Sequence, residues 1–247
     1  PREPLRGAIV AYETFLHSRP QIPHYRFNLA TARLNLAWWL NRQGQTDEAE
    51  QLGFEAVSAL EWLIAEYPDD LRYADRDAES RIVYAQVLRD RGEFDRAYQH
   101  LEIAVDHFEA QTLDERVLPS HRERLAEALL LIGQIVVLDG ENDSAREIIT
   151  AAVGQLQQLL GDDAIPQISD LIAWAQFRLA WIEWHDGNKD VARQHTVNAI
   201  ALRQAMPRTA VWLDSHAWLL LFAPDVQQRD SQLAAELLEQ ATNLVPE

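Results

Sequence analysis

The sequence contains no cysteine, one methionine, and a single lysine among its 22 basic residues. The lack of cysteine excludes disulfides, thiolate metal ligands and thiol nucleophiles. No stretch approaches the roughly 18 consecutive apolar residues of a membrane-spanning helix, so direct membrane insertion is not expected. Acidic residues outnumber basic ones by 39 to 22, and the formal net charge of -17 would repel a nucleic-acid backbone. Nucleic acid is therefore not an expected ligand.

A short string, Gly-x-x-Asp-x-Ala, recurs four times along the chain. Its copies begin at Gly44, Gly92, Gly140 and Gly187, which are 48, 48 and 47 residues apart. A second alanine follows the alanine of each copy by seven residues, at Ala56, Ala104, Ala152 and Ala199. The glycine is suited to end one helix in a left-handed conformation, and the aspartate to cap the next helix. Each copy therefore predicts a tight corner between two helices, with small residues where the neighbouring helix approaches.

The segments on both sides of these corners have helical periodicity, and no strand is predicted. The first helices of the pairs are expected at 25–43, 71–91, 119–139, 167–186 and 208–222. The second helices are expected at 3–18, 47–66, 95–112, 143–160, 189–205 and 231–244. A single pair of this kind cannot bury its apolar face, so the pairs must stack on one another.

Stacking of these pairs predicts one all-α domain over 1–247, a right-handed superhelical solenoid of antiparallel helix pairs. It would consist of a half repeat at 1–20, repeats at about 25–67, 71–112, 119–160 and 167–205, and a shortened cap repeat at 208–247. The chain begins with Pro1 rather than methionine. We expect it to be part of a larger multidomain protein.

The pattern resembles the tetratricopeptide (TPR) repeat, which has a small residue late in its first helix, a glycine at the corner and two alanines seven apart. The first small position is filled by Ala37, Ala85, Gly133 and Ala180, and the large position before it by Leu36, Tyr84, Ile132 and Leu179. The usual repeat has about 34 residues. The longer repeats here resemble those attached to bacterial serine/threonine kinases and to membrane-linked transcriptional regulators.

In TPR arrays the first helix of each pair lines a concave groove, so the resemblance implies a groove that can be located by counting back from each corner glycine. The partner-binding residues expected from this count are Trp38, Asn41, Arg42, Gln86, Arg89, Gln134, Trp181, Trp184 and His185. Trp174, Phe177, Trp181 and Trp184 also form a stripe on one helix, which is either core packing or an exposed anchor for a partner. The single lysine excludes the lysine-rich carboxylate clamp known in this family.

No catalytic signature occurs in the sequence: there is no glycine-rich phosphate loop, no His-Glu-x-x-His pair and no Gly-x-Ser-x-Gly turn. The histidines show no metal-ligand spacing. We expect no catalytic residues, no metal site and no cofactor.

The favoured function is a non-catalytic interaction or scaffold module that binds a peptide or partner domain in its groove. The alternative is a sensory or regulatory domain that binds a small ligand for an attached kinase or transcription regulator, and a third possibility is self-association. The overall charge and a local acidic run, Asp69, Asp70, Asp75, Asp77 and Glu79, favour a basic partner. The sequence indicates a soluble domain and leaves its compartment open, with the cytoplasm favoured over an extracytoplasmic location.

Overall fold

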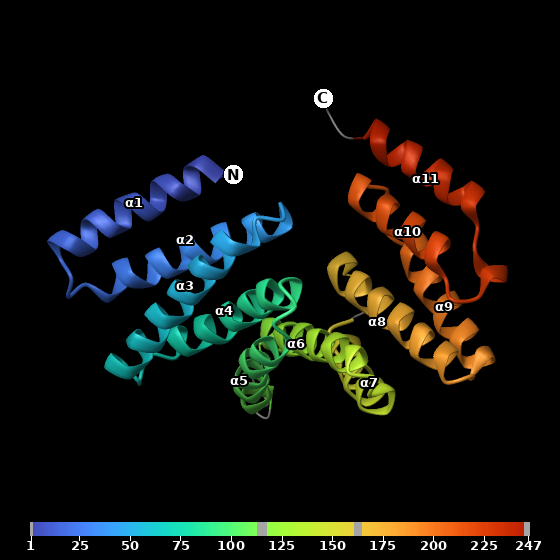
Figure 1. The fold of residues 1–247 in the computed structure, drawn as a ribbon, viewed down its shortest axis with the longest axis horizontal. Helices are drawn as coiled ribbons and strands as arrows, with labels where there is room; N and C mark the ends of the chain where they lie inside the picture. The colour runs from blue at the N-terminus through green and yellow to red at the C-terminus, as the bar shows by residue number, and fades with distance from the viewer. Residues whose placement is uncertain (1, 113–117, 161–164, 245–247) are drawn as a thin grey trace. The chain divides into compact units, whose positions relative to one another are not determined.

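The structure is a computed structural model that describes residues 2–112, 118–160 and 165–244. Regular structure in this part of the chain is helical throughout (Figure 1). The α-helices are α1 (Arg2–Ser18), α2 (Pro23–Arg42), α3 (Thr46–Glu66), α4 (Leu71–Asp90), α5 (Phe94–Thr112), α6 (Pro119–Leu138), α7 (Asn142–Gln157), α8 (Pro166–His185), α9 (Lys189–Gln204), α10 (Ala210–Phe222) and α11 (Ser231–Asn243).

The expected helix ends agree with these bounds to within three residues, so the predicted series of helix pairs is confirmed. One element was not predicted, the short 3-10 helix η1 (Val226–Gln228) between α10 and α11. It begins where the carboxylate of Asp225 accepts a hydrogen bond from the backbone N–H of Gln227 at 2.9 Å. None of the helices in the described ranges is long and apolar enough to cross a membrane.

The corners between paired helices form as the repeated string predicts. Gly44, Gly92, Gly140 and Gly187 have φ angles of 75°, 80°, 81° and 88°. Backbone N–H groups that follow the helix return to its last carbonyls, as when the N–H of Glu93 donates to the carbonyl of Leu88 at 2.8 Å. The paired alanines of all four copies are fully buried, which lets the facing helices approach closely.

The role predicted for the repeated aspartate was wrong. The second helices begin one residue before it, and the α3, α7 and α9 N-caps make no side-chain hydrogen bond. The aspartate lies instead in the first turn, where its charge meets the positive end of the helix dipole. Asp143 and Asp190 also pair with arginines three residues later, Arg146 and Arg193, at 2.5 Å and 3.0 Å.

The chain divides into two compact units, residues 1–135 and 136–247, and the boundary falls near the C-terminal end of α6. In the first unit the core lies between successive helix pairs, and one of its clusters joins α1, α2, α3 and α4 through Ile9, Leu36, Ala49 and Val87. In the second unit one cluster joins α8, α9 and α10 through Phe177, Ala199 and Leu219. Another joins α10 to α11.

Candidate functional site

The first helices of the pairs line a hollow in each unit. In the first unit, α2, α4 and α6 enclose about 250 Å³. Residues lining this hollow are Leu34, Asn35, Trp38, Arg76, Glu79, Ile82, Val83, Gln86, Arg124 and Glu127. Its charged groups pair with one another, Arg76 with Glu79 at 2.7 Å and Arg124 with Glu127 at 2.6 Å. Two of the predicted groove residues, Trp38 and Gln86, therefore lie in a polar, ion-paired hollow.

Three other predicted groove residues of the first unit, Asn41, Arg89 and Gln134, form hydrogen bonds within the chain. Asn41 on α2 donates from Nδ2 to Asp90 on α4 at 2.7 Å. Arg89 donates to Asp90 at 2.9 Å and to Gln134 on α6 at 2.9 Å. The network fixes three first helices to one another, so these polar groups are already engaged within the chain.

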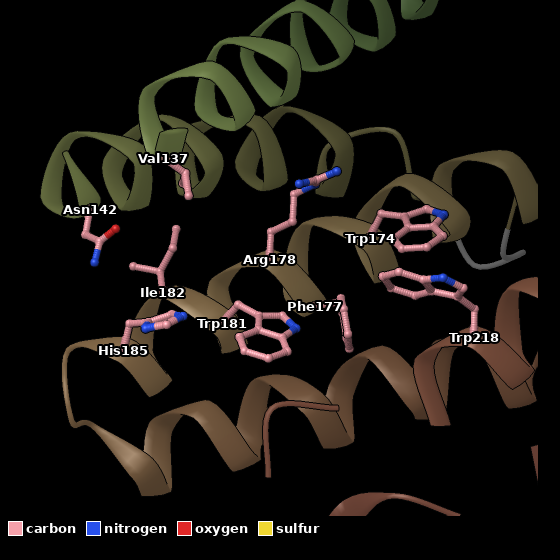
Figure 2. Close-up of a pocket in the computed structure, with 9 residues that line it drawn as sticks. All are labelled: Val137, Asn142, Trp174, Phe177, Arg178, Trp181, Ile182, His185 and Trp218. Atoms are coloured by element: carbon pink, nitrogen blue, oxygen red, sulfur yellow. The ribbon is translucent and has the colours of Figure 1, made fainter. Parts of the chain in front are cut away.

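The second unit contains a hollow of different character, which we call the aromatic hollow. It encloses about 220 Å³ and is lined by Val137, Asn142, Trp174, Phe177, Arg178, Trp181, Ile182, His185 and Trp218. Most of these side chains come from α8, and Trp218 comes from α10 (Figure 2). Of the predicted groove residues, Trp181 and His185 lie here.

Four rings of the second unit pack into a continuous cluster at this hollow. The ring centroid of Trp218 lies 4.9 Å from that of Trp174 and 5.2 Å from that of Phe177, and Figure 2 shows these side chains gathered on one side of α8. Phe222 extends the cluster, with its centroid 4.8 Å from Trp218. Phe177 is 3% exposed, whereas Trp218 is 40% exposed. The cluster therefore has a buried floor and an accessible edge.

The predicted stripe on α8 divides between core and surface. Phe177 belongs to the core, and Trp174 and Trp181 pack against that core while remaining partly exposed. Trp184 does not line the aromatic hollow. The ammonium of Lys189 lies 3.8 Å from the ring centroid of Trp184. In the first unit, Arg42 lies over the ring of Trp38 at 5.1 Å, and Trp38 is 45% exposed.

Trp218 is the aromatic lining residue of this hollow that the sequence reasoning missed. The counting rule needs a corner glycine, and the last repeat has none, because η1 and an extended segment connect α10 to α11. The available signal was the apolar run of α10, which gives no indication of which ring faces α8.

The aromatic hollow has no carboxylate among its lining residues, although the chain as a whole is acidic. Its polar groups are Arg178, His185 and Asn142. The nearby Glu183 is buried and accepts hydrogen bonds from Arg146 and from Asn188, both at 2.6 Å. The local electrostatics therefore suit an uncharged group better than a cation.

The acidic run of the first unit is largely engaged within the chain. Asp77 is 6% exposed and binds Arg81 at 2.6 Å, and Asp75 binds His107 at 2.8 Å. Asp70 caps α4 through the backbone N–H of Arg72. Within the described residues, no group of three or more histidine, aspartate or glutamate side chains is placed to hold a metal ion.

No protein-family model and no curated protein matches the chain. Among solved structures, it is similar to the apo form of RapI, with 15% identity over 98% of this chain and 77% of that one and a TM-score of 0.67. It is also similar to the nearly identical TPR-like repeats of a Podosopora anserina putative kinesin light chain, with 18% identity, coverage of 91% of this chain and 96% of that one, and a TM-score of 0.55.

A third similar structure is aspartyl phosphate phosphatase F from Bacillus subtilis. The identity is 14% and the TM-score 0.61, over 88% of this chain but only 49% of the phosphatase. At these identities the similarity establishes the fold alone. The fold is thus a TPR-like solenoid of helix pairs, as the repeat pattern predicted.

Proposed function

We propose that this TPR-like chain is a non-catalytic interaction module that binds a peptide or partner domain through its first helices. The observation that carries the proposal is the aromatic hollow, where Trp174, Trp181 and Trp218 remain accessible around the buried Phe177. Tryptophan side chains dominate binding energy at protein interfaces because they bury a large area at little conformational cost.

The hollow suits an aromatic or branched aliphatic side chain of the partner as an anchor. Its walls are mainly apolar, and Arg178, His185 and Asn142 provide polar contacts beside them. A basic anchor would lose its hydration without gaining a carboxylate partner. Basic residues farther along the partner would still be attracted by the net charge of -17, chiefly through a faster association rate.

The volume of the hollow favours a single side chain over a drug-sized ligand. Pockets that enclose drug-sized ligands measure about 300–1,000 Å³. The aromatic hollow, at about 220 Å³, is smaller than these. A sensory role through a small ligand is therefore less well supported at this site. The idea that the module serves a longer protein rests on the resemblance of its long repeats.

The test uses a peptide selected from a random display library with the intact chain as bait. Calorimetry then compares its affinity for the wild type and for the double variant Trp181→Ala, Trp218→Ala. Because buried tryptophans at interfaces contribute about 2 kcal/mol or more, we expect a loss of at least roughly 30-fold. The matched control is Trp62→Ala, since Trp62 is 38% exposed, lies in α3 of the other unit and does not line this hollow.

Circular dichroism should confirm that both variants remain helical. Selection of peptides whose affinity is the same for the wild type and the double variant would contradict the proposal, as would a selection that yields no binding peptide.

A further inference from the structure

A second hollow of the C-terminal unit lies between the end of α9, α10 and α11. It encloses about 290 Å³ and we call it the Arg203 hollow. The residues that line it are Arg203, Gln204, Met206, Pro207, Arg208, Trp212, Leu213, His216, Leu233, Glu236, Leu237 and Gln240. It shares no lining residue with the aromatic hollow.

Two deeply buried basic side chains line this hollow with part of their hydrogen-bonding capacity unused. Arg203 is 3% exposed and pairs with Asp170 through Nη1, while its Nε and Nη2 have no hydrogen-bond partner among the residues that the structure describes. His216 is 6% exposed, and its Nε2 likewise has no hydrogen-bond partner in the described part of the chain. Buried polar groups are nearly always paired, so unpaired nitrogens on residues that line a cavity point to a ligand that accepts hydrogen bonds, from the guanidinium and from the Nε2–H tautomer of His216.

The charges at the hollow favour an anion at its deep end. Burial lowers the pKa of Arg203 to about 10, so the guanidinium keeps its charge at neutral pH. Burial and the charges of Arg203 and Arg208 lower the pKa of His216, which leaves a neutral imidazole. Asp170 offsets one positive charge. Glu236 lies at the exposed rim and accepts a hydrogen bond from Gln232, and Arg208 donates to Gln240.

The remaining wall is apolar, because Leu213, Leu237 and Met206 are buried and Trp212 and Leu233 are partly buried. The sulfur of Met206 lies 3.8 Å from Arg203 Nη1. A methionine side chain is flexible, so its rotation can open the guanidinium to a ligand. A site of this kind suits a small acid with an apolar tail rather than a strongly hydrated phosphate.

We propose that the Arg203 hollow binds a small organic acid, whose carboxylate bonds to Arg203 and His216 and whose short apolar tail packs on Trp212, Leu213 and Leu233. A planar guanidinium with two free nitrogens can hold a carboxylate through two parallel hydrogen bonds. The site shares no lining residue with the aromatic hollow, so the two proposals can fail independently.

The probe is sodium hexanoate, titrated into the whole chain at constant ionic strength. Thermal unfolding and tryptophan fluorescence provide the readouts, since Trp212 lines the hollow and Arg203 lies 5.2 Å from the Trp174 ring centroid. We expect a saturable rise in Tm and a saturable change in fluorescence. Hexan-1-ol, which has the tail without the charge, should bind at least about tenfold more weakly, in keeping with the value of a charged hydrogen bond.

Leu233→Trp places a larger side chain in the wall of the hollow. Because the indole would occupy space that the apolar tail needs, hexanoate should bind at least about tenfold more weakly. The matched control is Leu238→Trp on the same helix, because Leu238 is 37% exposed and does not line the hollow. The variant Trp181→Ala, Trp218→Ala should bind hexanoate as the wild type does.

Several results would overturn the proposal. These are an absence of saturable binding relative to sodium chloride, equal affinity for hexanoate and hexan-1-ol, or full affinity in a folded Leu233→Trp variant. Tighter binding of inorganic phosphate than of hexanoate would replace the organic acid with an oxyanion. Binding of a leucine-terminated peptide with a free carboxylate, but not of hexanoate, would assign the site to a chain terminus.

Discussion

The corner glycines and the buried alanines show how single residues set the geometry of each helix pair. Gly92 has a φ of +80°, and a Cβ added there would meet no atom within 4 Å. The demand for glycine at this corner is therefore one of backbone conformation and not of space. At the alanines beside the corners the requirement is one of space. They are fully buried, and a larger side chain would push the helices apart.

A pair of glycine substitutions separates these effects. Gly92→Ala should lower the free energy of unfolding by about 1 kcal/mol, since a left-handed conformation is unfavourable for alanine. Gly154→Ala should raise it by about 0.5–1 kcal/mol, because Gly154 is inside α7 and an added Cβ meets nothing within 4 Å. Urea unfolding with unchanged slope measures both values. Equal effects of the two substitutions would contradict the assignment of Gly92.

At the scale of the helices, buried polar groups fix how α3, α4 and α5 pack. Arg81 on α4 binds Asp77 at 2.6 Å and Glu61 on α3 at 2.7 Å. It also lies 3.1 Å from Nδ1 of His100 on α5, whose ring packs against Tyr84. Burial, together with the charges of Arg81 and Arg96, lowers the pKa of His100 to about 4.

This shift predicts a pH dependence of stability. Between pH 6.5 and about 4 the unfolded chain protonates His100 while the native chain does not, so stability falls as the pH falls through this range. The wild type should lose about 1–2 kcal/mol more than His100→Gln over this interval, after allowance for solvent screening. Urea midpoints at a series of pH values measure the difference. Parallel curves for the two proteins would disprove a native-state shift at His100.

The helices themselves could be predicted from the sequence because their determinants are local. Apolar periodicity, corner glycines and prolines near the helix starts fixed their bounds to within three residues. The repeated aspartate was wrongly predicted to be the helix cap. An acidic residue is favoured by the helix dipole both at the cap and in the first turn, so the sequence does not distinguish the two positions. Only the backbone geometry distinguishes the two positions.

At the scale of the whole chain, the fold was predictable and the sites were only partly so. Trp181 was found by its register relative to Gly187, whereas Trp218 belongs to a repeat without a corner glycine. Arg89 and Asn41 were predicted to contact a partner, which stays a prediction, and their bonds to Asp90 within the chain could not be read from the sequence. The Arg203 hollow depends on the packing of α9, α10 and α11, which no local pattern encodes.

The central claim is that the aromatic hollow is the binding surface, and the indole N–H resonances of the eight tryptophans test it directly. Each resonance is assigned by a Trp→Phe variant, and the selected peptide is titrated into the labelled chain. We predict that the resonances of Trp174, Trp181 and Trp218 shift on binding, while those of Trp62 and Trp212 stay in place. Saturable binding that leaves the first three resonances unmoved would contradict this claim.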